Sequence, residues 1–386
     1  MSGTFAVEKP MGVTSSQYLL QLQQLLEKVP DFRVKDSYDI KIRKRKRLPL
    51  VKAGHGGTLD PAADGVMIIA VNDATKTLSK YLECTKTYDV VMHFGVSTTS
   101  YDREGKVLAY APTTCVSKQA IEEAMSHFRG EIEQIPPIYS ALKMGGKALH
   151  EYARDVKELP RGISPRKAII SELILTSDLS YDHDIPIPTI AATESERLQE
   201  RVFREAGLET MVKNGSKIAT IELENIRRDP VPELPEIDKE EEPAPEPESR
   251  KKKKGKKRKY NDHKEDEFQK TPEVHLEPPT DQEYPIINLR MTVSSGTYVR
   301  SIVHDLAIAM GTKAYVRHLT RVTQGEWKMG KNVISAEEIA QNPVEVWSEK
   351  ARFYMSKGPD AGEYVAEESI EKAQPAEPTS IEEKKE

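Results

Sequence analysis

The chain has 386 residues, of which 37% are hydrophobic and 31% are charged, and its mean hydropathy is −0.60. This length allows two or three domains, but the composition is too polar for one packed core, so we expect part of the chain to be disordered. Apolar runs fall well short of the roughly 18 residues of a membrane-spanning helix, and the N-terminus resembles neither a secretory signal nor a conventional mitochondrial presequence. Two cysteines, Cys84 and Cys115, exclude a disulfide framework and a four-thiolate zinc site. We expect an intracellular protein held together by its core.

Charge is distributed unevenly along the chain. Residues 182–283 hold 19 basic and 26 acidic residues, and residues 332–386 hold 6 basic and 13 acidic residues, so each segment carries a net charge of −7. The remainder, residues 1–181 and 284–331, carries +9. A basic body favours a polyanionic partner such as nucleic acid, although moderate positive charge is also common in proteins that bind none.

Hydrophobic periodicity predicts the elements of the first hundred residues. They are a helix at 15–29, a loop rich in Gly, Asp and Pro at 53–65, a buried strand at 66–71, a helix at 72–84 and a strand at 88–96. Ser15 or Ser16 is expected to cap the first helix. Asn72 is expected to cap the second helix, which should bury Leu82.

The rest of the chain mixes patterned and low-complexity segments. The patterned segments predict a helix at 117–129, a loop, glycine turn and short helix at 135–155, strands at 216–226 and 284–293, and a helix at 294–311. Proline and blocks of one charge sign predict disorder over most of 229–280 and after about residue 357, because such sequences bury too little apolar surface. Strands and helices without regular alternation favour an α+β fold with a mixed or antiparallel sheet.

The loop at 54–65 is the best candidate for chemistry. Asp60 stands just before a buried strand, where a carboxylate can be held rigidly, although an isolated Leu-Asp-Pro is more often a turn in which Asp bonds its own backbone. His55 is likewise more often structural than catalytic. The loop lacks the glycine patterns of nucleotide-binding loops, and the histidines lack common zinc-site spacings. A carboxylate therefore remains the candidate reactive group.

Five segments match one known family in sequence order. They are EKPMGVTS at 8–15, AGHGGTLDP at 53–61, KTYDVVMHFG at 86–95, IPPIYSALKMGGKALHEYAR at 135–154 and SSGTYVRSIVHDL at 294–306. Together they closely resemble the TruB-type pseudouridine synthases, over roughly residues 5–178 and 284–331. The resemblance implies a pseudouridine synthase fold, with a mixed, mostly antiparallel sheet, flanking helices and a central RNA-binding cleft. It also implies an enzyme that uses no cofactor and no metal.

The resemblance further implies the catalytic residues. Asp60 would be the essential carboxylate, and Arg300 would pair with it and keep it ionised and oriented. Tyr88 would stack on the target uracil near the C5 proton. Outside these motifs, Arg300 would be read as a surface residue and Tyr88 as strand packing. The carboxylate can act as a nucleophile or remove the C2′ proton of the sugar, and the sequence leaves both routes open.

Four other residues are implied in substrate binding. Tyr298 and Leu319 match positions that line the uridine pocket. Lys9 matches a lysine beneath the pocket, for which the alternative is a structural ion pair. His55 matches a histidine that fills the space left by flipped bases, since a stacked uridine must be extruded before an enzyme can reach it.

The usual substrate of this family is the T-loop uridine of tRNA (position 55), in a stem-loop that is recognised by shape. T-loop-like hairpins in mRNA are further candidates. We expect the catalytic domain to occupy residues 1–181 and 284–331, interrupted by a charged, largely disordered insertion at 182–283. The acidic extension at 332–386 is too short for a PUA domain, which favours a stand-alone tRNA enzyme, and the insertion resembles that of the eukaryotic stand-alone branch. We expect a monomer. A guide-RNA-dependent synthase and an RNA-folding chaperone are the alternatives.

The chain contains two runs of basic residues. The run RKRKR is expected to contact RNA phosphates through Arg43, Lys44, Arg45, Lys46 and Arg47. The run RKKKKGKKRK at 250–259 is typical of a nuclear localisation signal, an RNA tether or a solvated spacer. We expect a nuclear protein, with the mitochondrion as a second location.

Overall fold

The computed structural model describes residues 1–154, 164–213 and 273–364, with the side chains of α6 (Glu194–Lys213) described as far as residue 204. The strand predicted at 216–226, the basic run at 250–259 and most of the stretch predicted to be disordered lie outside these ranges. No helix within the described ranges is long and apolar enough to cross a membrane.

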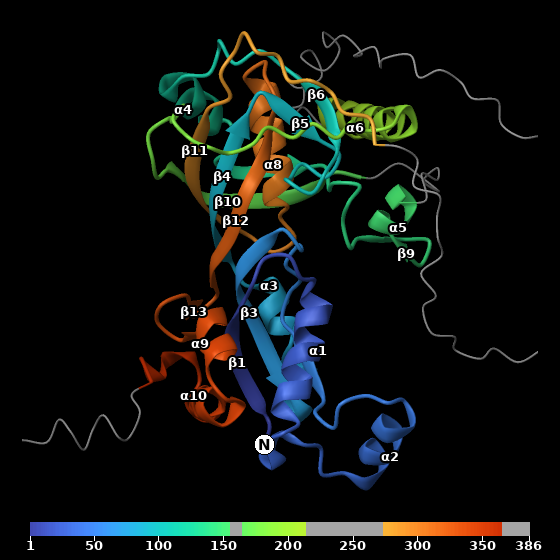
Figure 1. Cartoon of the computed structure of the whole chain (residues 1–386), viewed down its shortest axis with the longest axis vertical. Coiled ribbons are helices and arrows are strands. Elements are labelled where there is room, and N and C mark those ends of the chain that lie inside the picture. The colour runs from blue at the N-terminus through green and yellow to red at the C-terminus, as the bar shows by residue number, and fades with distance from the viewer. Residues whose placement is uncertain (155–163, 214–272, 365–386) are drawn as a thin grey trace, which may run out of the picture.

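Ten strands form one mixed sheet that extends along the molecule (Figure 1). Its main path is β14-β1-β3-β12-β4-β11-β10-β7, with β2 beside β3 and β13 beside β12. The strands are β1 (Gly3–Lys9), β2 (Ala53–His55), β3 (Ala63–Val71), β4 (Lys86–Phe94), β7 (Gly130–Gln134), β10 (Arg166–Leu175), β11 (Ile286–Val293), β12 (Ala314–Gln324), β13 (Trp327–Lys328) and β14 (Val333–Ile334). Only β1 with β14 and β3 with β12 are parallel among these strand pairs of the described chain. The α+β fold with a mixed, mostly antiparallel sheet is confirmed.

Helices flank both ends of this elongated arrangement. They are α1 (Ser15–Leu26), α2 (Ser37–Arg45), α3 (Ser79–Glu83), α4 (Lys118–Ser126), α5 (Leu149–Arg154), α6, α8 (Val299–Ala309), α9 (Ala336–Gln341) and α10 (Val344–Lys357). In Figure 1, α1, α9 and α10 lie around β1 and β3, whereas α8 lies at the other end with β4, β10 and β11. Two small hairpins join the second group: β5 (Val96–Thr98) with β6 (Val107–Tyr110), and β8 (Lys143–Met144) with β9 (Lys147–Ala148).

Two hydrophobic cores meet along β3. One core packs β4, β11 and α4 around α8, whose apolar face is buried as its helical spacing predicts. The other lies among α1, α10, β1 and β3. Since Ala63 belongs to the first core and Val66 to the second, the loop just before β3 reaches the boundary between them. This boundary is where the candidate site lies.

Two predicted helix caps are wrong. Thr14 caps α1, because its hydroxyl accepts from the Gln17 backbone N–H at 3.1 Å, while the Gln17 side chain accepts from the Thr14 N–H at 3.0 Å. Asn72 caps no helix: it has φ +55°, and its amide donates to the carbonyls of Met1 and Phe32. The segment after it is a 3₁₀ turn, η2 (Asn72–Thr77), followed by the short α3, and Leu82 is 51% exposed instead of buried.

Both ends of the 182–283 insertion are ordered and pack on the body. The Ala191 N–H donates to the Val274 carbonyl and the Leu276 N–H to the Thr189 carbonyl, each at 2.8 Å. Ala191 also forms a bridge with Val107 in β6, and α6 follows directly. Residues 273–280 are therefore an ordered end of the insertion, and the folded body continues beyond the expected boundary at 181.

The first part of the C-terminal extension is also built into the fold. Strand β14 pairs with β1, Ala6 opposite Val333, and α10 packs on β1. Trp347 and Tyr354 of α10 are buried in the second core. The boundary expected at 331 therefore falls inside the core. Strand β12, which the sequence did not predict, runs through the centre of the sheet.

Candidate active site

A pocket of about 230 Å³ opens at the boundary of the two cores. Five segments distant in the sequence form its wall: the loop before β3, the stretch from α3 to the start of β4, the turn before β8, the loop before α8 with its first residues, and the middle of β12. The predicted site residues that line it are Asp60, Tyr88, Tyr298, Arg300 and Leu319. The structure therefore brings together five of the seven residues predicted for catalysis and uridine binding.

The Asp60 loop is fixed by the start of α1. The Ser15 hydroxyl accepts from the Leu59 N–H at 2.8 Å and donates to the Leu59 carbonyl at 2.9 Å. The Gly12 N–H donates to the Pro61 carbonyl at 2.8 Å. These bonds hold the backbone on both sides of Asp60, so its carboxylate direction is set by residues fifty positions earlier in the chain.

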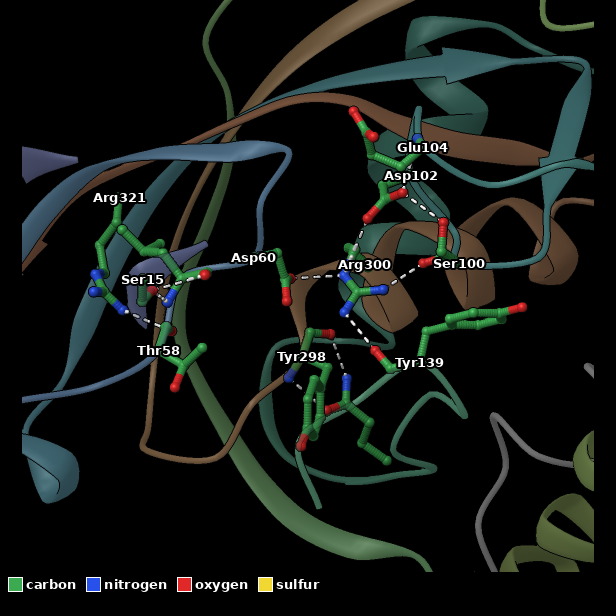
Figure 2. A network of polar contacts seen from close by, with 12 residues as sticks. Ser15, Thr58, Asp60, Ser100, Asp102, Glu104, Tyr139, Tyr298, Arg300 and Arg321 are labelled. Atoms are coloured by element: carbon green, nitrogen blue, oxygen red, sulfur yellow. Dashed lines mark hydrogen bonds and ion pairs between the residues drawn. The ribbon is translucent and has the colours of Figure 1, made fainter. Parts of the chain in front are cut away.

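The Asp60 carboxylate pairs with Arg300. The Arg300 Nε lies 2.8 Å from Asp60 Oδ2, and the arginine side chain is 4% exposed while that of Asp60 is 36% exposed (Figure 2). The Asp60 carboxylate therefore faces both a buried cation and the open pocket. An Asp-Pro turn in which the carboxylate bonds only its own backbone, the alternative reading, does not describe this contact.

Three further contacts hold the Arg300 guanidinium. Its Nη1 donates to the Ser100 carbonyl and its Nη2 to the Tyr139 carbonyl, the latter at 3.0 Å. Asp102 Oδ2 lies 3.6 Å from Arg300 Nε, while its other oxygen accepts from the Ser100 hydroxyl. Burial alone would lower the pKa of Arg300, but Asp60 and Asp102 together raise it above its ordinary value. The guanidinium is a permanent, oriented cation beside Asp60.

Tyr88, Tyr298 and Leu319 come from three different elements. Tyr88 is a buried residue of β4, and Leu319 of β12 pairs with the neighbouring Val90. Tyr298 immediately precedes α8, and its backbone N–H and carbonyl are both bonded by the Gln134 side chain, at 2.8 and 2.9 Å. Their aromatic and aliphatic groups give the pocket apolar walls around a charged pair, which suits a flat, polar-edged base.

Gly65 permits the close approach of β3 and β12. It has φ +101°, and a Cβ built there would lie 2.3 Å from the Arg321 carbonyl oxygen. Any other residue at this position would push the two strands apart. Because β12 carries Leu319 and Arg321 to the pocket, this contact positions one whole wall of the site.

Lys9 lies beneath the site and does not line the pocket. It is completely buried, and its Nζ donates to the carbonyls of Pro10 and Val13 at 2.7 and 2.9 Å. Burial lowers the pKa of Lys9 to about 8, against the opposing charges of Asp64 and Asp60. Among the described residues, the Lys9 ammonium donates to backbone carbonyls, so the ion-pair alternative does not describe it.

His55 ends β2 and also lies outside the pocket wall. It pairs with Ile69 in the sheet, and its ring is partly buried. Burial lowers the pKa of His55, and its Nδ1 is buried without a hydrogen-bond partner in the described chain. A neutral, partly buried ring is consistent with a space-filling role, which stays a prediction.

The predicted RNA-contacting run lies far from the pocket. Ala53 of β2 is opposite Val71, so the chain before it lies at the end of β3 opposite to Asp60, as Figure 1 shows for α2. The Arg43 guanidinium donates to the carbonyls of Pro49 and Val51, so Arg43 has a structural role in the connection between α2 and β2. The exposed candidates for phosphate contact are Lys44, Arg45, Lys46 and Arg47.

Two residues of the site, Asp102 and Arg321, were not predicted from the sequence. Arg321 is buried, lines the pocket and donates through Nε to the Val66 carbonyl at 2.7 Å. Asp102 lies in a polar stretch between β5 and β6, and nothing in its spacing indicates a partner 198 positions later. Among the described residues, no three His, Cys, Asp or Glu side chains are close enough to hold a metal ion.

Comparison with known proteins identifies the family. The model of the TruB family pseudouridylate synthase (N terminal domain) matches residues 45–187. A Saccharomyces cerevisiae protein named tRNA pseudouridine synthase 4 is 35% identical over 376 residues, 93% of this chain and 86% of that protein. A Schizosaccharomyces pombe protein of the same name is 33% identical, over 90% of this chain and 84% of that protein. The tRNA pseudouridine synthase B of Streptococcus thermophilus is 42% identical over 147 residues, 38% of this chain and 50% of that protein. With two relatives aligned along most of both chains, and with an ion-paired aspartate in a pocket between two cores, this chain belongs to the TruB family and is an RNA pseudouridine synthase.

Proposed function

We propose that this chain converts one uridine of tRNA, the T-loop uridine at position 55, to pseudouridine without a guide RNA. The observation that carries the proposal is the Asp60 carboxylate, which faces an open pocket while a buried Arg300 fixes its orientation. The two yeast relatives, aligned over 86% and 84% of their lengths, are named as tRNA pseudouridine synthases. This extent of similarity supports tRNA as the substrate class.

The chemistry requires little more than a positioned carboxylate. The N1–C1′ bond of the uridine breaks, the uracil turns, C5 bonds to C1′, the C5 proton is released and N1 takes up a proton, so the product is an isomer of the substrate. One Asp60 oxygen, Oδ2, accepts from Arg300, which leaves Oδ1 to attack C1′ or to remove the C2′ proton. In either route the same carboxylate is regenerated at the end. No electron leaves or enters the substrate, so the reaction balances without an external redox partner.

The pocket accounts for how a single base is held. A stacked uridine must be extruded, at a cost of a few kcal/mol that is lowest in a loop. Tyr88 and Tyr298 would stack against the flipped uracil, and Leu319 would close the remaining side. His55, on the strand that enters the same loop, would occupy the space that the base leaves.

The site of modification tests the proposal. A transcript of the T-stem-loop alone, and a matched transcript with the T-loop uridine replaced by cytidine, are incubated with the purified chain and mapped by carbodiimide-primer extension. We expect one pseudouridine, at the T-loop position of the first transcript, with no other RNA added. Modification at a different uridine would contradict the assigned position. A folded chain that binds the hairpin but modifies it only in the presence of a second RNA would contradict stand-alone action.

A further inference from the structure

The insertion helix α6 is anchored in the body through charged side chains. Glu200 and Arg204 are 9% and 3% exposed, although both lie in the segment that interrupts the motifs of the family. Arg204 Nη2 lies 2.6 Å from Asp305 Oδ1, an ion pair whose two side chains are 4% and 9% exposed. Buried charges are costly unless a specific geometry pairs them. The Arg204–Asp305 ion pair therefore fixes how α6 packs on α8, and Asp305 lies five residues after Arg300 on α8.

Tyr101 is the partner of Glu200. Its hydroxyl donates to Glu200 Oε1, and its ring stacks on His304 of α8 at a centroid distance of 4.1 Å and an interplanar angle of 14°. Tyr101 is 1% exposed and has φ +60°, a left-handed conformation that a bulky side chain rarely adopts. Such a backbone persists only where the surroundings hold it. Glu200 of α6 and His304 of α8 both contact the Tyr101 side chain and so stabilise this backbone conformation.

The residues on either side of Tyr101 hold the catalytic arginine. The Ser100 carbonyl accepts from Arg300 Nη1, and Asp102 Oδ2 lies 3.6 Å from Arg300 Nε (Figure 2). The direction of both groups depends on the unusual backbone of Tyr101 between them. The hydrogen bond from the Tyr101 hydroxyl to Glu200 therefore affects Arg300 indirectly, because Ser100 and Asp102, the neighbours of Tyr101 in the chain, both contact the guanidinium.

A second connection runs through Phe203. Phe203 of α6 is buried in a small core with Ile138, Met144 and Leu149, and Tyr139 packs against that core. The Tyr139 carbonyl accepts from Arg300 Nη2 at 3.0 Å. One helix thus supports both backbone carbonyls that orient the guanidinium.

We propose that Glu200, Phe203 and Arg204 of α6 are positioning residues for the Arg300–Asp60 pair, so that the insertion completes the active site from outside the motif-bearing segments. The proposal deepens the proposed function and rests on it, because its readout is the rate of uridine isomerisation. Simple packing of α6 would need only apolar contacts, whereas Glu200 delivers a directed hydrogen bond to the strained residue between two Arg300 contacts.

The test separates the chemical step from RNA binding. Single-turnover rates at saturating enzyme, and the Kd for the same tRNA transcript, are measured for wild type, Tyr101→Phe, Glu200→Ala, Glu200→Gln and the double variant Tyr101→Phe/Glu200→Ala. The matched control is Glu196→Gln on the same helix, whose carboxylate lies 3.0 Å from Lys106 instead of reaching the Arg300 surroundings. Circular dichroism and urea unfolding confirm that each variant is folded.

We expect Tyr101→Phe and Glu200→Ala to slow the single-turnover rate by about 10- to 100-fold with Kd for tRNA unchanged, since a displacement of order 1 Å at a reacting group has an effect of that size. Glu200→Gln, which keeps an acceptor for the hydroxyl, should recover most of the rate. The double variant should be no slower than the slower single variant, because both remove one bond. Glu196→Gln should stay within about twofold of wild type.

Folded Tyr101→Phe and Glu200→Ala variants with wild-type rates would overturn the proposal while leaving the proposed function intact. Rates that fall only in proportion to weaker tRNA binding would also overturn it. If Glu200→Ala does not fold, Tyr101→Phe decides alone, because it keeps the ring stacked on His304. A wild-type chain without activity on tRNA would instead contradict the proposed function.

Discussion

Arg300 contacts three segments that are far apart in the sequence. Its guanidinium bonds the Asp60 carboxylate and the carbonyls of Ser100 and Tyr139, so one side chain fixes the loop before β3, the loop after β5 and the turn before β8. The planar fork of five N–H donors makes this possible, whereas a lysine offers a compact charge without that geometry. The orientation of Asp60 is therefore a property of the whole arginine environment.

Lys9 leads to a prediction about pH. Burial lowers its pKa from 10.5 to about 8 in the folded protein. Between these two values the unfolded chain still binds the proton that the folded chain has released, so the free energy of unfolding rises with pH in this window. We expect the wild type to gain stability relative to Lys9→Met as the pH rises from about 8 to about 10.

Urea unfolding at a series of pH values measures this difference. The lost hydrogen bonds to Pro10 and Val13 affect Lys9→Met equally at every pH, so only the slope reports the titration. Parallel stability curves for the two proteins would show that Lys9 keeps an ordinary pKa.

The basic residues of and after helix α2 have two different roles: Arg43 bonds the backbone, and the four residues that follow it are exposed. Arg43 bonds the carbonyls of Pro49 and Val51 and so shapes the connection to β2. The following residues, Lys44 to Arg47, are exposed near the end of β3 that lies opposite to Asp60. Contacts there would reach a part of an RNA remote from the flipped base.

Neutralising Lys44, Arg45, Lys46 and Arg47 to glutamine, with Arg43 retained, should weaken tRNA binding and flatten its salt dependence. Each phosphate contact contributes a slope of roughly −0.7 to −0.9 to a plot of log K against log salt, so four contacts would account for a slope change of about 3. The measurement is a series of Kd values at increasing salt. Arg43→Gln is expected to lower stability instead. Equal slopes for the wild type and the fourfold variant would exclude this run from the RNA interface.

Strand β14 and helix α10 complete the part of the molecule that contains the N-terminal strand β1. Strand β14 extends the sheet beside β1, and α10 covers that edge with the 1% exposed Trp347. Trp327 and Tyr354 pack in a T-shaped pair at 5.7 Å. The first part of the acidic extension therefore belongs to the second core, which also contains the N-terminal strand β1.

Trp347→Ala should lower the free energy of unfolding by about 3–5 kcal/mol, the usual cost of removing a large buried aromatic side chain. Trp347→Phe should cost less, because it keeps most of the apolar volume and the indole N–H has no hydrogen-bond partner within the described chain. Urea unfolding followed by circular dichroism measures both. A loss below about 1 kcal/mol for Trp347→Ala would show that α10 is peripheral.

The parts of the fold with regular patterns could be predicted, and the parts built on buried polar groups could not. The apolar run of β3 and the helical face of α8 both indicate their elements directly. In β12, the buried Arg321 and Gln324 interrupt the apolar alternation, because Arg321 bonds the Val66 carbonyl of β3 and Gln324 the Gly56 carbonyl of the loop, so the strand has no clear signal. In the insertion, the charged middle segment dominates the composition, so the burial of Phe203 near its start could not be predicted from the composition.

The candidate site shows the same division. Asp60 and Arg300 could be paired from sequence because the motifs that contain them match one family in order. The links from Asp102 and Glu200 to the same arginine depend on tertiary contacts between segments about 100 to 200 positions apart, which no local pattern encodes.

The most direct test of the account is tritium release from a tRNA transcript labelled at C5 of uridine, with the purified chain alone and Asp60→Asn beside it. The wild type should release one equivalent of tritium per tRNA. Asp60→Asn should release none while it binds the transcript with similar affinity, because the amide can neither attack C1′ nor accept the C2′ proton. Comparable release by Asp60→Asn, or no release by a folded wild type that binds the tRNA, would contradict the account.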